Sequence, residues 1–150
     1  MATHTFKVPR WRGFDNPFGD IWTNLDGVVI QRTAANEISS VYTTTDKAEF
    51  TDVIGNKTIA GYEVAQDGYI KEFDLGETAE IIPSSCTGAS ITTYMCDYHY
   101  CNASSTALRT LLVGGYAYGG GGAGLGSFSS SVGVGDAFSD VGFRTLNRVS

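Results

Sequence analysis

The chain has 150 residues, enough to bury one hydrophobic core, and we expect residues 1–150 to form a single domain. Its formal net charge of −6 leaves no basic surface for phosphates, which excludes nucleic acid as a partner. No run of about 18 apolar residues is present, so membrane insertion is not expected. The first residues also lack the apolar segment of a secretory signal.

The N-terminal half predicts a domain that is mostly β with short helices, because Gly and Pro interrupt nearly every window with a helical pattern. The clearest helix covers residues 17–24, with Asp15 or Asn16 as its cap. Asp26 and Gly27 then predict a turn. Strands are expected at 28–30, 41–44, 58–64 and 68–73, and residues 81–83 are expected to lead into a loop rich in Ser, Thr and Gly.

Two connections in this half have their own signals. Residues 66–68 form a turn signal between two of the expected strands, and residues 48–50 suggest a short helix or an exposed crossover. The aromatic segment 93–100 is expected to pack over the core.

Three cysteines are too few for a disulfide scaffold, and their odd number leaves one unpaired, so we expect reduced thiols. Cys96, His99 and Cys101 have a spacing that suggests zinc. In an extended segment, however, Cys96 points to the opposite face from the other two, and no second cluster completes four ligands. We therefore expect no metal, with Cys96 a buried thiol and Cys101 near the surface.

The most informative segment covers residues 108–147. An apolar run at 111–113 ends in Gly114 and Gly115, a long stretch of Gly, Ser, Ala, Tyr and Phe follows, and residues 141–146 predict a closing strand. We interpret the stretch between them as a long Gly/Ser-rich surface loop that a sheet holds at both ends. Loops of this composition build binding faces, with rigid aromatic area beside adaptable hydroxyl groups.

The ligand-binding residues expected on this loop are aromatic, hydroxyl, carboxylate and small apolar side chains: Tyr116, Tyr118, Phe128, Ser129, Ser130, Val132, Asp136, Phe138 and Asp140. The alternative is that the aromatic side chains pack back into the core and the glycines only permit tight turns.

No catalytic centre is expected. His4 and His99 are the only histidines, and no Ser lies in a nucleophile-elbow pattern. The carboxylates are dispersed, so neither a hydrolytic pair nor a calcium site stands out. The glycines at 114–126 lack the Lys-Ser/Thr pair of a phosphate-binding loop, so no cofactor is expected.

The string LRTLLVGG, followed by the Gly/Ser-rich segment and VGFR, resembles the closing part of the C-type-lectin-like fold. Formylglycine-generating (sulfatase-modifying) enzymes share that fold with variable proteins of phages and bacteria that retroelements diversify. Residues 16–30 and 96–100 resemble domains at the ends of Bacteroides phage fibre proteins. This resemblance, which covers most of the chain, implies an α+β fold of the C-type-lectin-like kind, with Arg144 as a structural anchor beneath the loop.

The two branches of the family imply different functions. The enzymes carry a copper-binding cysteine pair after the double glycine, whereas no cysteine follows Gly115 here, which disfavours the enzyme. In the variable proteins, diversified asparagine-type codons cannot encode Lys, Glu, Gln, Met or Trp. All five residue types are absent from residues 111–143.

The resemblance therefore implies a non-enzymatic domain of a phage virion, on a fibre, that binds a bacterial surface glycan or protein receptor through its variable loop. Fibre proteins of this kind imply a homotrimer that contacts other virion proteins. One alternative is a structural domain that decorates a capsid or fibre by packing its loop on a neighbouring subunit. A sulfatase-modifying enzyme is the least favoured reading.

Overall fold

A computed structural model describes residues 10–11, 14–15, 18–86 and 97–142 of the chain. The strands, in chain order, are β1 (Arg10–Trp11), β2 (Phe14–Asp15), β3 (Trp22–Arg32), β4 (Ser39–Thr43), β5 (Thr58–Glu63), β6 (Gly68–Leu75), β7 (Ile81–Cys86), β8 (Tyr98–Cys101), β9 (Arg109–Val113), β10 (Phe128–Ser130) and β11 (Val141–Gly142). Two short 3-10 helices, η1 (Lys47–Glu49) and η2 (Gly120–Gly122), complete the elements.

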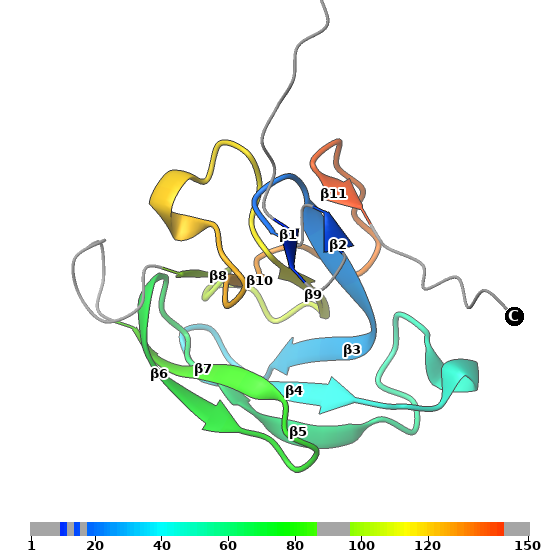
Figure 1. The fold of residues 1–150 in the computed structure, drawn as a ribbon. Coiled ribbons are helices and arrows are strands. Elements are labelled where there is room, and N and C mark those ends of the chain that lie inside the picture. The colour runs from blue at the N-terminus through cyan, green and yellow to red at the C-terminus, as the bar shows by residue number, and fades with distance from the viewer. Residues whose placement is uncertain (1–9, 12–13, 16–17, 87–96, 143–150) are drawn as a thin grey trace, which may run out of the picture.

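Nine strands form one curled sheet in the order β5-β4-β3-β9-β10-β8-β6-β7, with β11 added to β3 (Figure 1). The two ends of this order meet, because the backbone N–H of Val64, after β5, donates to the carbonyl of Pro83 in β7 at 3.0 Å. A Cβ on Gly61 would lie 2.7 Å from Cδ1 of Ile82, so the absence of a side chain lets β7 pack closely on β5. The sheet is therefore a nearly closed barrel.

The expected α+β class and the C-type-lectin-like fold are wrong. Over the described residues there is no α-helix, and the strands curl into a barrel that the lectin arrangement does not have. The helix expected at 17–24 is replaced by bends at 18–21 and by the start of β3 at Trp22. No helix in the described ranges is long and apolar enough to cross a membrane.

The strands expected in the N-terminal half are confirmed, but their connections differ. Gly27 lies inside β3 with a φ of 80° instead of starting the strand as a turn. A Cβ there would lie 2.9 Å from the carbonyl oxygen of Thr44, so only glycine fits. The strands on either side of residues 66–68, β5 and β6, do not pair with each other, since β5 pairs with β4, and β6 pairs with β7 and β8.

The single long loop expected between β9 and the last strand is also wrong. Residues 114–140 contain η2 and then β10, which lies in the middle of the sheet between β9 and β8. Its partners are antiparallel on one side and parallel on the other. Such pairing depends on residues far away in the chain, which can override the low strand propensity of a Gly- and Ser-rich sequence. The closing strand expected at 141–146 begins as β11, and residues 143–146 and Arg144 lie outside the described residues.

The core lies inside the barrel and is built from one side of most strands. It consists of Ile30, Val41, Ala60, Ile82, Leu111 and Phe128. Alternate residues of a strand point to opposite faces, and β10 uses both faces. Phe128 and Ser130 contact groups inside the barrel, whereas Ser129 lines a pocket outside it.

Candidate functional site

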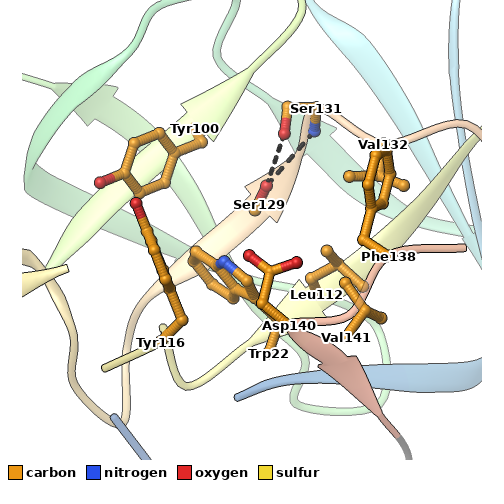
Figure 2. Close-up of a pocket in the computed structure, with 10 residues that line it drawn as sticks. All are labelled: Trp22, Tyr100, Leu112, Tyr116, Ser129, Ser131, Val132, Phe138, Asp140 and Val141. Carbon is orange, nitrogen blue, oxygen red and sulfur yellow. Dashed lines mark hydrogen bonds between the residues drawn. The ribbon is translucent and has the colours of Figure 1, made fainter. Parts of the chain in front are cut away.

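The candidate site is a pocket of about 280 Å³ on the outer face of the barrel, where β3, β8, β9, β10 and β11 come together (Figure 2). It is lined by aromatic, aliphatic, hydroxyl and carboxylate side chains: Trp22, Tyr100, Leu112, Tyr116, Ser129, Ser131, Val132, Phe138, Asp140 and Val141. We call it the aromatic pocket. Its volume is near the lower end of the roughly 300–1,000 Å³ found for small-molecule sites.

Three aromatic rings form one wall of the aromatic pocket. The Trp22 ring stacks on Tyr116, with centroids 6.1 Å apart and planes at 28°, and meets the edge of Tyr100 at 5.8 Å and 88°. Tyr100 in turn lies 4.4 Å from Tyr98 on the same strand, and Tyr98 lies 5.0 Å from Tyr69 on β6. The rings brace one another across three strands and a loop, which fixes the orientation of the wall.

Polar groups and a second apolar wall complete the pocket. Figure 2 shows Tyr100 and Tyr116 on one side and Val132 and Phe138 on the other, with the Asp140 carboxylate between them. The hydroxyls of Ser129 and Ser131 lie 3.0 Å apart and form a polar strip on β10 and just after it. The pocket thus offers flat apolar surface, hydroxyls that donate and accept, and one carboxylate acceptor.

The Gly-rich segment after β9 is a folded support for Tyr116. Gly115 has a φ of 73°, and a Cβ there would lie 2.6 Å from that of Ala123, so the backbone turns tightly against itself. The Asp97 carboxylate accepts from the N–H of Gly126 at 2.9 Å, and the Ser127 hydroxyl accepts from the N–H of Gly124 at 2.9 Å. These contacts hold a segment that composition alone assigns to a flexible loop.

The other side of the pocket is held by β11. Its Val141 pairs in parallel with Trp22, and the N–H of Trp22 donates to the carbonyl of Asp140 at 2.8 Å. Both partners of this pairing line the pocket, so the first residue of β3 and the last part of the described chain build one site.

Tyr98 and Tyr100 keep their protons at neutral pH. Burial raises the pKa of Tyr100 above its usual value, and the neighbouring Tyr116 and Tyr98 add to the shift. Burial, followed by the charge of Asp67, likewise raises the pKa of Tyr98. The phenols therefore act as neutral hydrogen-bond donors and acceptors.

The structure brings together five of the nine residues expected to bind a ligand: Tyr116, Ser129, Val132, Phe138 and Asp140. Tyr118 is 93% exposed and does not line the pocket. Asp136 accepts from the N–H of Gly133 at 3.0 Å and closes a turn. Phe128 and Ser130 are buried inside the barrel.

Sequence reasoning missed the other half of the pocket: Trp22, Tyr100, Leu112, Ser131 and Val141. Trp22 fell in the helix expected at 17–24, and Tyr100 in a segment expected to cover the core. No local signal could join them to the Gly-rich segment, because long-range strand pairing makes the site.

A second cluster of functional side chains lies inside the barrel. His99 is fully buried, and its Nε2 donates to Glu63 Oε1 at 2.7 Å while its Nδ1 donates to the carbonyl of Gln66 at 2.8 Å. The Cys86 thiol lies 3.6 Å from the same Nδ1, and the Ser130 hydroxyl donates to Glu63. We call these residues the polar cluster.

The polar cluster holds a charged histidine. Burial by itself would lower the pKa of His99, but the hydrogen bonds to Cys86 and Glu63, the Glu63 charge and the Gln66 carbonyl outweigh it. Together they raise the pKa of His99 to about 9. Both ring nitrogens face acceptor oxygens, which is the arrangement that an imidazolium needs. Since His99 is fully buried, its ring has no contact with solvent.

The structure describes two of the three cysteines. Cys86 and Cys101 are free, and Cys96 lies outside the described residues. Cys101, expected near the surface, is instead 8% exposed, and burial and the nearby Asp67 raise its pKa to about 12. Within the described part of the chain, no group of three or more His, Cys, Asp or Glu residues could hold a metal ion.

A scan against protein-family models, a search of curated proteins and a search of solved structures found no match to this chain.

Proposed function

We propose that this chain is a non-enzymatic ligand-binding domain and that the aromatic pocket holds a glycan. The observation that carries the proposal is that an aromatic wall of Trp22, Tyr100 and Tyr116 shares one pocket with polar groups. These are the hydroxyls of Ser129 and Ser131 and the carboxylate of Asp140.

A sugar ring matches these two surfaces. Its C–H face is flat and apolar and packs on an aromatic ring, while its hydroxyls lie around the edge and exchange hydrogen bonds with hydroxyls and carboxylates. The volume of about 280 Å³ suits one or two sugar units at the end of a chain. Braced rings lose little conformational freedom on binding, which favours affinity.

Presentation on a phage fibre, as a homotrimer that contacts bacterial surface glycans, is part of this proposal and derives from the resemblance of residues 16–30 and 96–100 to domains at the ends of Bacteroides phage fibre proteins. A single pocket of this size supports only weak binding. Several copies held together raise the effective concentration, and the summed affinity can exceed that of one copy by about 10²–10⁴. The account therefore favours a receptor with repeated glycan units.

A glycan array that displays bacterial surface oligosaccharides tests the proposal. We expect the wild-type domain to bind a subset of them and Tyr116→Ala to lower the affinity about tenfold or more, as for a central aromatic contact. Tyr118→Ala is the matched control, since this tyrosine lies in the same segment but is 93% exposed and outside the pocket. Binding that Tyr118→Ala weakens and Tyr116→Ala does not would refute the assignment to the pocket.

The second candidate function is structural decoration of a capsid or fibre. The observation that favours it is the exposure of two large side chains on the Gly-rich segment, Tyr118 at 93% and Leu125 at 62%, which can pack on a neighbouring subunit. The double change Tyr118→Ser and Leu125→Ser separates the two functions. It would dissociate a decorating assembly in sedimentation experiments, whereas glycan binding would persist.

A further inference from the structure

The barrel contains a second cavity at the end where β4 stops and β7 starts. It has a volume of about 190 Å³, and half of the residues that line it are Val28, Val41, Ile82, Leu111 and Phe128. No residue that lines it also lines the aromatic pocket. We call it the barrel cavity.

The wall of the barrel cavity is the hydrophobic core itself. Val41 and Ile82 are 1% exposed, and Leu111 and Phe128 are 7% and 4% exposed. Cavities with such walls exclude water and accept compact nonpolar molecules, and a cavity of about 150 Å³ already binds benzene. Each unfilled space also forfeits dispersion contacts, so an occupant that fits stabilises the fold.

The rim makes the cavity accessible. Leu25 and Ile81 line it and are 36% and 59% exposed, although both are large and apolar. They lie on β3 and β7. The cavity lining therefore reaches the surface at these two residues.

One charged group stands at this rim. The Glu80 carboxylate accepts from the Thr43 hydroxyl at 3.1 Å and from the backbone N–H of Thr78 at 3.0 Å. The hydrogen bond from the Thr78 hydroxyl is the main cause that lowers the pKa of Glu80, so the group is ionised at neutral pH. Among the residues that line the cavity, none is Lys, Arg or His.

We propose that the barrel cavity binds a small primary amine, with its alkyl or aryl group inside the core and its ammonium group beside Glu80. The apolar wall selects a compact hydrocarbon, and the single carboxylate with no cationic neighbour in the lining selects a positive head group. A neutral alcohol of the same length retains the hydrocarbon contacts only, and a carboxylate ligand is repelled.

Titration with n-hexylamine, 1-hexanol and hexanoate at pH 7, followed by ligand-observed NMR, tests this site. The wild-type domain should bind hexylamine about fivefold more tightly than hexanol, the gain expected for a partly solvated ion pair, and should not bind hexanoate. Glu80→Gln should make hexylamine and hexanol equal. The matched control Glu72→Gln, an exposed carboxylate on β6 outside the cavity, should change nothing.

A filled cavity provides the second test. Val28→Phe places a ring in the space and should abolish binding of both ligands, while melting curves confirm that the variant is folded. If that variant does not fold, intermolecular NOEs between the hexylamine methyl group and the Phe128 ring in the wild type decide the site. Absence of hexylamine binding, equal affinities for hexylamine and hexanol in the wild type, or absence of those NOEs would overturn the proposal.

Discussion

The two ends of the barrel interior are built from opposite kinds of side chain. At one end, the polar cluster joins β5, β7, β8 and β10 through a buried charge pair between His99 and Glu63. At the other end, aliphatic side chains and Phe128 form most of the lining of the barrel cavity, with Thr43 and Glu80 at its rim. The two ends lie close together. Phe128 and Ser130 are two residues apart on β10, and the ring centroids of His99 and Phe128 are 5.6 Å apart.

The difference teaches how a small barrel can be both specific and adaptable. The two ring nitrogens of His99 and Oε1 of Glu63 each have a particular partner, so a shifted strand register would leave a charge unpaired in the core. The apolar end carries no such requirement and tolerates an incompletely filled space. We therefore expect the polar end to define the fold and the apolar end to leave room for a ligand.

The largest effect is expected when the polar end loses its carboxylate. Glu63→Ala leaves the buried His99 without a counter-charge and should lower the free energy of unfolding by about 3–5 kcal/mol in urea titration. Glu72→Ala, an exposed carboxylate, should change it by less than about 0.5 kcal/mol. Equal losses of stability in Glu63→Ala and Glu72→Ala would contradict a special role of the polar end.

The same charge pair predicts how stability depends on pH. Because the pKa of His99 rises from 6.5 to about 9, the folded protein binds its proton more tightly than the unfolded chain does. The stabilisation is complete below about pH 6.5 and is lost as pH rises to 9. It amounts to about 3 kcal/mol.

Urea titrations at pH 6.5 and 9 measure this loss. The variant His99→Gln, which cannot take up a proton, should lose much less stability over that range than the wild type. A wild type whose stability is flat between the two pH values would contradict a charged histidine in the core.

Substitution by a larger or more apolar side chain should change the stability of the fold in opposite directions at the two ends. Ser130→Val removes the hydroxyl that donates to Glu63 and should destabilise the fold by about 1–3 kcal/mol. Val28→Phe fills part of the barrel cavity and should stabilise it by about 0.5–1 kcal/mol, which raises the melting temperature by a few degrees. Calorimetry measures both, and destabilisation of similar size by both variants would show that the apolar end is already fully packed.

The smallest effect on stability is expected at the outward face of β10. Ser129→Ala removes a hydroxyl whose partner is Ser131 at 3.0 Å and should cost less than about 1 kcal/mol. The same change should weaken glycan binding about three- to tenfold, because the hydroxyl lines the aromatic pocket. Calorimetric titration of wild type and variant with one array-selected oligosaccharide measures it, and unchanged affinity would remove Ser129 from the site.

The sequence predicts local strand signals well and their assembly poorly. The apolar and β-branched residues around Val28, Val41 and Leu111 lie in strands as expected, because alternation and propensity are local properties. The order of the strands is not local. Closure of β7 on β5, and insertion of β10 between β9 and β8, depend on contacts between distant segments.

For the candidate site as well, the sequence predicts the residues that share one local segment and misses those that distant strand pairing brings in. Tyr116, Phe138 and Asp140 could be selected as a group because they share one segment and a composition typical of binding loops. The pattern FSS at 128–130 gives too short a signal to separate a buried strand from a loop, so the inward positions of Phe128 and Ser130 could not be foreseen. Trp22, which belongs to the aromatic wall, joins the site only through its pairing with β11.

The most direct test of glycan binding uses Trp22 as a reporter. The chain has two tryptophans, so Trp11→Phe leaves Trp22 as the only source of tryptophan emission. Titration of this variant with the oligosaccharide that binds best on the array should change the emission saturably, and Tyr116→Ala in the same background should weaken that response about tenfold. An oligosaccharide that binds while the Trp22 emission stays unchanged, or an array without any bound glycan, would contradict the account.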